Sequence, residues 1–338
     1  MADKIAGRIE GESAGAPEYD YDYEARFIKQ KREHERVAIL PRVVKPAMFA
    51  HGEFALGDMR VFARYTVAPL SALTCAFADL RGGEESAPRR MIPSVVAYIV
   101  EGSGESIQDG ERFPFAAGDL VLVPPYTTYR FAAGAGGCRA WLPQIRLWHG
   151  QGLLSRDPAP HGESATAFEE KIEAVFRSRR AMRGPASGKT RYDWFLSKLA
   201  EENRVEREGL RVVRGMDRAW ETTRQGKIKF YIDRWTEVPA CGLDLMAQEL
   251  APGEQSGEHR HIFEELLLVL EGRGYDLHEG TRHAWERGDL ICVPPMIVHR
   301  HVNDGTEAVR LISVWPRQPG HEFLGGIEHI GDGSNWRR

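Results

Sequence analysis

The feature that most constrains the fold of this chain is an internal repeat without gaps. Residues 95–134 align with residues 265–304 at a constant offset of 170, and 12 of the 40 aligned pairs are identical. The identities gather in expected turns, such as Gly-Asp-Leu at 118–120 and again at 288–290. Because the offset is about half of the 338 residues, the chain is predicted to contain two copies of one folding unit.

Each copy is predicted to be an antiparallel β unit. Short runs rich in Val, Leu, Ile and aromatic residues are separated by Gly, Asp-Gly and Pro-Pro turns. The spacing of about 8–12 residues between turns is typical of sandwiches and barrels. We therefore expect an all-β chain built from two barrels.

The overall composition indicates a folded protein without affinity for nucleic acid. Hydrophobic residues make up 42% and charged residues 28%, as in ordinary globular domains. The 45 basic and 49 acidic side chains give a net charge of −4, so the basic excess that phosphate binding requires is missing. Nucleic acid is not an expected partner.

Neither a membrane segment nor a disulfide framework is expected. The longest apolar run, Leu266–Leu270, is far too short to span a bilayer, and the first residues lack an apolar signal core. The cysteines are scattered without CxxC spacing, which suits a reducing compartment: Cys75, Cys138, Cys241 and Cys292. These features predict a cytoplasmic protein.

The segments outside the repeat are predicted to form an arm and a helical linker. Tyr19–Arg36 is charged and aromatic without strand alternation, which fits a packing arm or a solvated tail. Ala167–Arg183 and Arg191–Gly209 space their apolar residues as amphipathic helices do. The resulting segments are an N-terminal arm, a first barrel, a helical linker and a second barrel: 1–45, 46–150, 151–225 and 226–338.

The second copy carries a group of metal-ligating residue types. His259 and His261 project from the same side of a strand, and Glu265 follows at an even spacing. His299 lies on the predicted returning strand and can complete the group. Imidazoles with one carboxylate and open positions are what an oxygen-activating non-haem Fe(II) site needs. We therefore expect one Fe(II) per chain.

The spacing of these residues resembles the two cupin motifs, G(X)5HXH(X)3E(X)6G and G(X)5PXG(X)2H(X)3N. The chain fits both at every position except one, where Met296 replaces the usual glycine. The resemblance implies a jelly-roll β-barrel that holds the metal inside through His259, His261, Glu265 and His299. Met296 alters a turn preference and leaves the ligands untouched.

The first copy serves as an internal control for this interpretation. At the offset of 170, the positions that correspond to the four candidate ligands are occupied by Arg89, Met91, Val95 and Tyr129. None of these is a good ligand for a divalent metal at neutral pH. The first barrel is therefore predicted to be metal-free and structural, with ligand binding there as the alternative.

Further residues of the second copy are candidates for the lining of the pocket. His301 stands two residues beyond His299, so strand alternation aims it at the same cavity, as a proton donor or a hydrogen-bond partner of the substrate. A solvent-exposed rim histidine is the alternative. The candidate substrate contacts, for which ordinary core packing is the alternative, are Met246, Gln248, Phe230 and Trp235.

Two barrels with one metal site resemble the bicupin ring-cleaving dioxygenases. These include the gentisate, 1-hydroxy-2-naphthoate and salicylate 1,2-dioxygenases, and the large subunit of two-component hydroquinone 1,2-dioxygenase. The gentisate type keeps its metal in the first barrel and uses histidines without the motif glutamate, so Glu265 favours the hydroquinone type.

That resemblance implies an extradiol-type, Fe(II)-dependent cleavage of hydroquinone, or a substituted hydroquinone, by O₂ to 4-hydroxymuconic semialdehyde in aromatic catabolism. It also implies a smaller subunit in an α2β2-like hetero-oligomer.

Other functions stay open at this point. One alternative is a gentisate- or salicylate-type 1,2-dioxygenase, and another is a cupin isomerase or decarboxylase that uses Fe, Mn or Ni. A non-catalytic ligand-binding or storage bicupin fits less well, because storage proteins are secreted and usually lose their metal ligands.

Overall fold

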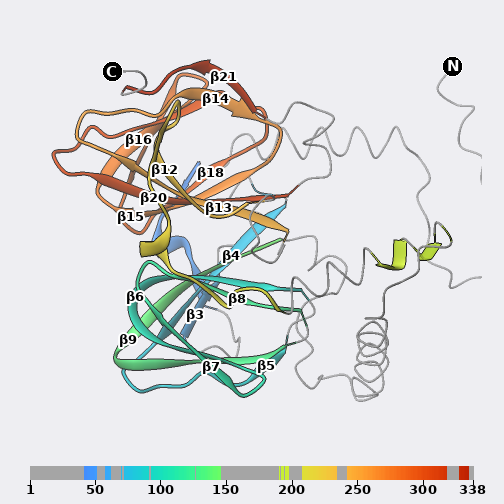
Figure 1. Ribbon diagram of the computed structural model, residues 1–338. Helices are drawn as coiled ribbons and strands as arrows, with labels where there is room; N and C mark the ends of the chain where they lie inside the picture. The colour runs from blue at the N-terminus through green and yellow to red at the C-terminus, as the bar shows by residue number, and fades with distance from the viewer. Residues whose placement is uncertain are drawn as a thin grey trace, which may run out of the picture. The chain divides into compact units, whose positions relative to one another are not determined.

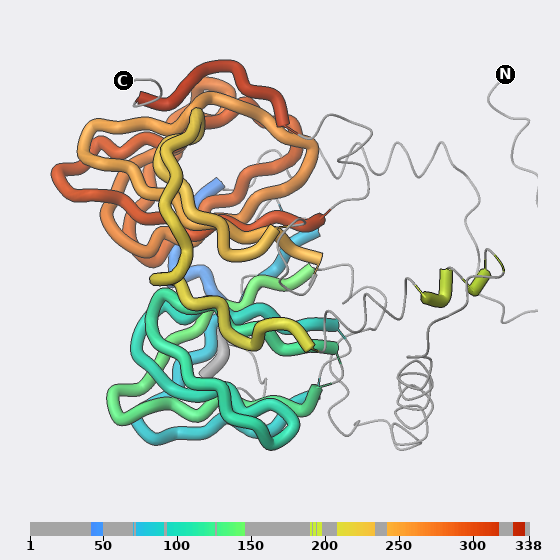
Figure 2. Tube along the Cα trace, in the orientation of Figure 1, coloured from blue at the N-terminus to red at the C-terminus, as the bar shows by residue number. Residues whose placement is uncertain are grey.

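The computed structural model describes residues 42–51, 58–61, 70, 72–90, 93–125, 127–145, 190, 192–193, 195–197, 208–233, 242–317 and 327–334. Within these ranges nearly all regular structure is β-strand, and the strands pair antiparallel in two barrels (Figure 1, Figure 2). The prediction of an all-β chain with two barrels is confirmed. Among the described helices, none has the length and apolar character needed to cross a membrane.

The first barrel is a single sheet with the path β10-β8-β6-β9-β4-β3-β2, to which β5 and β7 are attached. Its strands are β2 (Ala50–His51), β3 (Asp58–Val61), β4 (Leu73–Leu80), β5 (Arg89–Arg90), β6 (Val95–Gln108), β7 (Glu111–Ala116), β8 (Leu120–Val123), β9 (Thr128–Ile145) and β10 (Val212–Val213).

The second barrel consists of two sheets, ordered β1-β18-β15-β20-β13-β12-β11 and β17-β16-β19-β14-β21. Its strands are β1 (Val43–Val44), β11 (Glu221–Thr223), β12 (Gly226–Ile232), β13 (Leu243–Leu250), β14 (Glu258–His261), β15 (Glu265–Glu271), β16 (Arg273–His278), β17 (Thr281–Glu286), β18 (Leu290–Val293), β19 (His299–Val302), β20 (Val309–Pro316) and β21 (Ile327–Gly331). Two short 3-10 turns, η1 (Pro46–Met48) and η2 (Gly215–Asp217), join strands of the two barrels.

The internal repeat reappears in the strand registers. Val95 of β6 lies opposite Val123 of β8, and Glu265 of β15 lies opposite Val293 of β18, so the offset of 170 is kept in both strands. The hairpins between β6 and β7 and between β16 and β17 also correspond. Asp109 and Glu279, each followed by glycine, have a positive φ of 48°, as tight hairpin turns require.

The edges of the barrels differ from the expected segments. Val43–Val44, inside the expected arm, pairs with β18, while Val212–Val213, inside the expected linker, pairs with β8. These short strands reach into each barrel because their valines complete a buried edge. The predicted arm Tyr19–Arg36 and the helix Ala167–Arg183 lie outside the described residues. Of the helix Arg191–Gly209, residues 192–193, 195–197 and 208 are described and are helical.

One hydrophobic core contains side chains from both barrels. Cys75 and Leu120 of the first barrel share it with Leu245, Leu268 and Cys292 of the second. Such burial contributes roughly 25 cal/mol for each Å² of apolar surface removed from water. Since alternate residues of a strand face opposite sides, the core also fixes which face of β13 and β15 looks into the second barrel.

A buried carboxylate ties the second barrel to the start of β4. Glu264 is 3% exposed, and its Oε2 accepts hydrogen bonds from the backbone N–H groups of Ala72 (2.7 Å) and Leu73 (3.2 Å). Glu264 immediately precedes β15, so this contact anchors the beginning of the strand that carries Glu265.

Replacement of Glu264 is expected to destabilise the fold. Glu264→Ala leaves two backbone donors without this acceptor, which should lower the free energy of unfolding by about 1–3 kcal/mol. Urea denaturation followed by circular dichroism measures this loss. The control is the exposed Glu307→Ala, whose effect should stay within about 0.5 kcal/mol. Equal midpoints and slopes for both variants would contradict the anchoring role of Glu264.

Candidate metal centre

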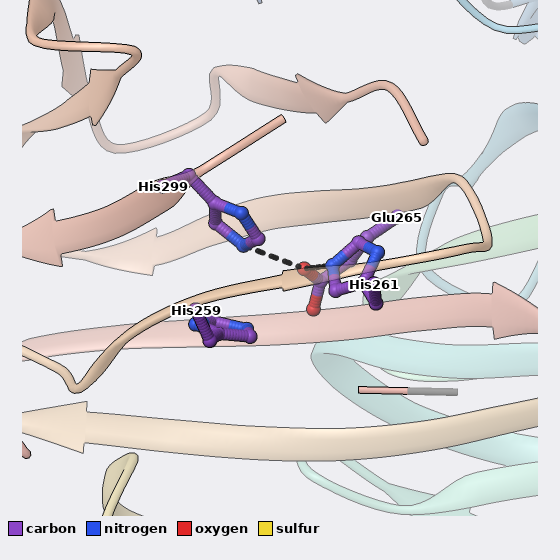
Figure 3. Close-up of side chains that lie close together, drawn as sticks. All are labelled: His259, His261, Glu265 and His299. Atoms are coloured by element: carbon purple, nitrogen blue, oxygen red, sulfur yellow. Dashed lines mark hydrogen bonds and ion pairs between the residues drawn. The ribbon is translucent and has the colours of Figure 1, made fainter. Parts of the chain in front are cut away.

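Four side chains from three strands of the second barrel meet in its interior. His259 and His261 come from β14, Glu265 from β15 and His299 from β19 (Figure 3). His259 lies directly opposite His299 in the β14–β19 ladder. One ligand atom from each residue lies within 4.8 Å of the others, and all four residues are buried. The group can therefore hold a metal ion.

The backbone fixes which nitrogen each imidazole presents. In all three rings Nδ1 contacts the carbonyl oxygen of a residue two positions away: 3.1 Å for His259, 2.7 Å for His261 and 3.0 Å for His299. A carbonyl oxygen only accepts hydrogen bonds, so Nδ1 must carry the proton. In a neutral ring this leaves the lone pair on Nε2, the arrangement that metal-binding histidines use.

Burial lowers the pKa of two histidines of the cluster. Burial, reinforced by neighbouring His299, lowers the pKa of His259 to about 2. Burial also lowers the pKa of His299. Burial alone would raise the pKa of Glu265, but its contacts with His261 and His299 hold the pKa well below the usual value. At neutral pH the rings of His259 and His299 are therefore neutral, and Glu265 is an ionised carboxylate.

The ring nitrogens that do not contact the backbone face the carboxylate of Glu265. Oε2 of Glu265 lies 3.2 Å from Nε2 of His261 and 3.6 Å from Nε2 of His299 (Figure 3). Nε2 of His299 is buried without a hydrogen-bond partner among the described residues. Lone pairs directed at a carboxylate are stable only around a cation. The donor set and its geometry thus fit a divalent metal ion.

A second polar cluster lies beside the histidines. Asp276 of β16 is fully buried and receives hydrogen bonds from Nε1 of Trp285 (2.7 Å) and Nδ1 of His301 (2.9 Å). Nε2 of His278 lies 3.2 Å from its other oxygen. Burial alone would raise the pKa of Asp276, but His301 and His278 lower it. Asp276 is therefore an ionised carboxylate that fixes two imidazoles.

His301 is buried, in contrast to the alternative of an exposed rim residue. It is 3% exposed, and its ring centroid lies 5.6 Å from that of His299. Burial would lower its pKa, but the charge of Asp276 raises it above the usual value. Its role in proton transfer or substrate binding stays a prediction.

A row of aromatic rings leads away from the metal cluster. Phe263 stacks on His261 with ring centroids 4.1 Å apart, and Trp315 stacks on Phe263 at 5.6 Å. Phe230 meets Trp315 edge-on at 6.5 Å. Phe230 thus lies at the far end of the row, separated from the cluster by two rings. The predicted contact Trp235 lies outside the described residues.

The other two predicted contacts, Met246 and Gln248, lie on β13. Their neighbours Leu245 and Ala247 face the core shared by the barrels, so Met246 and Gln248 point to the opposite side. Gln248 is buried, and its Nε2 donates to the carbonyl oxygen of Gln225 (2.5 Å). This bond holds the amide at a turn, which favours a structural role for Gln248.

The corresponding positions of the first barrel are filled by other residues. Arg89 and Tyr129 are buried and face each other across β5 and β9, as His259 and His299 do in the second barrel. Met91 lies outside the described residues. Within the parts of the first barrel that the structure describes, no group of His, Cys, Asp and Glu has metal-binding geometry.

The metal content should not depend on the first barrel. Tyr129→Phe is expected to leave the stoichiometry at one metal ion per chain, because the metal-ligating group found in the described residues lies in the second barrel. Metal analysis of the desalted variant beside the unmodified chain tests this. Loss of metal from the variant would show that Tyr129 takes part in metal binding.

Sequence reasoning missed Asp276 and His278. The signal in the sequence is that both are polar and stand two residues apart in one strand of the repeat, so they face the same side. The first copy has Ser106 and Gln108 at the corresponding positions. That parity aims both pairs into their barrels. Met296 has a φ of 63°, the turn conformation that the usual glycine of the motif adopts easily.

Comparison with known proteins supports the assignment of the second barrel. Residues 246–315 match the family model of the Cupin domain. The chain is 24% identical over 248 residues to a 5-aminosalicylate 1,2-dioxygenase from Comamonas sp., which covers 70% of this chain and 63% of that protein. It is 24% identical over 247 residues to a 1-hydroxy-2-naphthoate 1,2-dioxygenase from Nocardioides sp. (strain KP7), covering 72% and 62%.

A gentisate 1,2-dioxygenase from Ralstonia sp. is 38% identical over 76 residues, 22% of this chain and 21% of that protein. In each of these cases the match spans less than two thirds of the relative. A solved oxalate decarboxylase from Bacillus subtilis superimposes with a TM-score of 0.59 at 15% identity, over 91% of this chain and 86% of that one. The chain therefore has an all-β bicupin fold, and its second barrel carries a His/Glu metal-binding site.

Proposed function

We propose that the chain is an Fe(II)-dependent ring-cleaving dioxygenase whose active site is the second barrel. The observation that carries this proposal is the set of three Nε2 lone pairs and one carboxylate oxygen directed at one buried point. A histidine and carboxylate set with open positions is typical of oxygen-activating non-haem iron. Iron bound there would supply the activation of O₂ that the aromatic ring alone does not achieve.

The protein residues would bind and orient the substrate. His259, His261, Glu265 and His299 would hold the iron. His301, fixed at Nδ1 by Asp276, would present Nε2 to the substrate as a hydrogen-bond partner or proton acceptor. Burial of the cluster excludes water, which strengthens these polar interactions and protects reactive species.

A hydroxylated aromatic acid is the substrate class that the relatives support best. The names of the three relatives refer to 5-aminosalicylate, 1-hydroxy-2-naphthoate and gentisate, all of which place a carboxylate beside a ring hydroxyl. This favours the gentisate- or salicylate-type alternative over hydroquinone, the substrate type that Glu265 favours in the sequence analysis. The two candidates differ in their substrate class, while the residues proposed to hold the metal are the same for both.

Hydroquinone is the second candidate, and Glu265 is the observation in its favour. A carboxylate ligand occupies a metal position that a chelating hydroxy acid would otherwise use. Hydroquinone cannot chelate, because its para hydroxyls are too far apart to reach one metal. The smaller partner subunit belongs to this second candidate only.

Oxygen uptake by the metal-loaded chain separates these functions. The chain is loaded anaerobically with Fe(II), Mn(II) or Ni(II) and mixed with O₂ and one of salicylate, 5-aminosalicylate, gentisate, 1-hydroxy-2-naphthoate or hydroquinone. We expect uptake with Fe(II) and at least one hydroxy acid. Uptake with hydroquinone alone, above all after co-expression with a smaller subunit, would support the second candidate. No uptake with any pair would overturn the proposed function.

A further inference from the structure

The two oxygens of Glu265 have different partners. Oε2 faces the Nε2 atoms of His261 and His299, at 3.2 Å and 3.6 Å. Oε1 instead accepts a hydrogen bond from the hydroxyl of Ser313. The carboxylate therefore presents one oxygen to the centre of the cluster, while the other is held from behind.

Ser313 is a fully buried polar residue in a mostly apolar stretch of β20. It lies on β20 between Ile312 and Val314, and all three residues have no exposed surface. Ile312 and Val314 face the core shared by the barrels, so Ser313 faces the interior of the second barrel, where a buried hydroxyl costs free energy unless it finds a hydrogen-bond partner. Ser313 lies opposite Leu267 of β15. Glu265 is two residues before Leu267 on β15 and points to the same face of the sheet, so the Ser313 hydroxyl is close to its carboxylate.

The first barrel lacks both members of this pair. In the second barrel, Ser313 lies opposite Met246 in the β13–β20 ladder. The counterpart of Met246 at the offset of 170 is Ala76, which lies opposite Leu142, so Leu142 takes the place of Ser313 in the first barrel. The counterpart of Glu265 is Val95. At these positions the first barrel has neither the carboxylate nor the hydroxyl, as expected if the hydroxyl serves the carboxylate.

We propose that Ser313 is a positioning residue that restricts Glu265 to binding the metal through one oxygen. This inference rests on the proposed metal binding. It adds that the Ser313 hydroxyl determines how many coordination positions of the metal Glu265 leaves free. Three imidazoles and one carboxylate oxygen leave two of the six positions of an octahedral ion free. Two positions suffice for O₂ and a substrate that binds through one oxygen; if both oxygens of Glu265 bound, one position would remain and the two could not bind together.

The test counts the open positions on the metal alone. The chain is loaded with Mn(II), and the relaxation rate of water protons is measured, since it scales with the number of exchangeable waters on the ion. Ser313→Ala is expected to keep Mn(II) but to show about half the relaxivity per ion of the unmodified chain. Ser313→Thr retains the hydroxyl and is the matched control, with relaxivity expected to equal that of the unmodified chain.

A second measurement does not depend on the folding of a variant. In the unmodified chain, the infrared difference spectrum between the metal-loaded and metal-free forms reports the carboxylate stretches of Glu265. A wide separation of the asymmetric and symmetric stretches, typical of binding through one oxygen, is expected. A narrow separation, typical of both oxygens, would overturn the inference.

The outcomes distinguish this inference from the proposed metal binding. If the unmodified chain binds no metal, the metal site itself is wrong. If it binds metal but folded Ser313→Ala has the same relaxivity as the unmodified chain, only the role of Ser313 is wrong. Reduced relaxivity in both Ser313→Ala and Ser313→Thr would also overturn it, because the hydroxyl would then not be the cause.

Discussion

The His299→Ala chain is expected to retain no metal after desalting and to have no oxygen-uptake activity. His299 has no exposed surface, and its Nε2 faces the cluster without another hydrogen-bond partner in the described residues. Loss of one ligand of four opens the site to water and removes the geometry that retains the ion. Metal analysis by mass spectrometry, with circular dichroism to establish folding, measures the effect. His259→Ala should behave in the same way.

The matched control for these variants is His283→Ala. His283 lies on β17 and belongs to the same barrel, with its ring 5.0 Å from that of His278, but it is not a member of the metal-ligating group. It should keep one metal ion per chain. Full metal content in folded His299→Ala would contradict the ligand assignment, and loss of metal from His283→Ala would show that the effect is not specific.

The Glu265→Gln chain is expected to lose metal affinity and activity together. An amide keeps the shape of the side chain and can still accept from Ser313, but it carries no charge to balance a divalent cation. The dissociation constant for Fe(II) should rise by more than the roughly 10–100-fold that loss of an outer hydrogen-bond partner costs. Competition with a fluorescent chelator measures the constant in both chains.

Two outcomes for Glu265→Gln would assign a different role to the carboxylate. A dissociation constant that rises by no more than about 10–100-fold, or an unchanged constant with activity reduced by about that factor, would place Glu265 outside the metal's own ligands, as a group that orients a histidine. Unchanged metal affinity with unchanged turnover would show that the carboxylate serves neither purpose. The thermal midpoint of the metal-free variant shows whether the fold itself has changed.

The two-barrel fold and the metal cluster could be predicted from sequence because the repeat and the spacing of the metal-ligating residue types are visible in the chain itself. The repeat sets the turns, and the parity of His259 and His261 places both rings on one side of β14. Sequence does not show hydrogen bonds between strands that are distant in the chain. Ser313 reaches Glu265 across 48 residues, and Glu264 reaches Ala72 across 192. Both contacts depend on sheet packing, which no local pattern encodes.

The boundaries of the barrels were hard to predict for a related reason. Val43–Val44 and Val212–Val213 are too short to show strand alternation, and they become strands only because they pair with β18 and β8. The expected substrate contacts show the same limit. Parity placed Gln248 on the inner side of β13, but its amide is bound to the turn at Gln225, which is visible only in the folded chain.

Oxygen-isotope labelling of the reaction tests the central claim most directly. The Fe(II)-loaded chain is supplied with ¹⁸O₂ and the hydroxy acid that gives the fastest oxygen uptake, and the product is analysed by mass spectrometry. Ring cleavage by a dioxygenase predicts a ring-opened product that carries both labelled oxygen atoms, and no label with His299→Ala. An intact ring, or a product without label from O₂, would contradict the account.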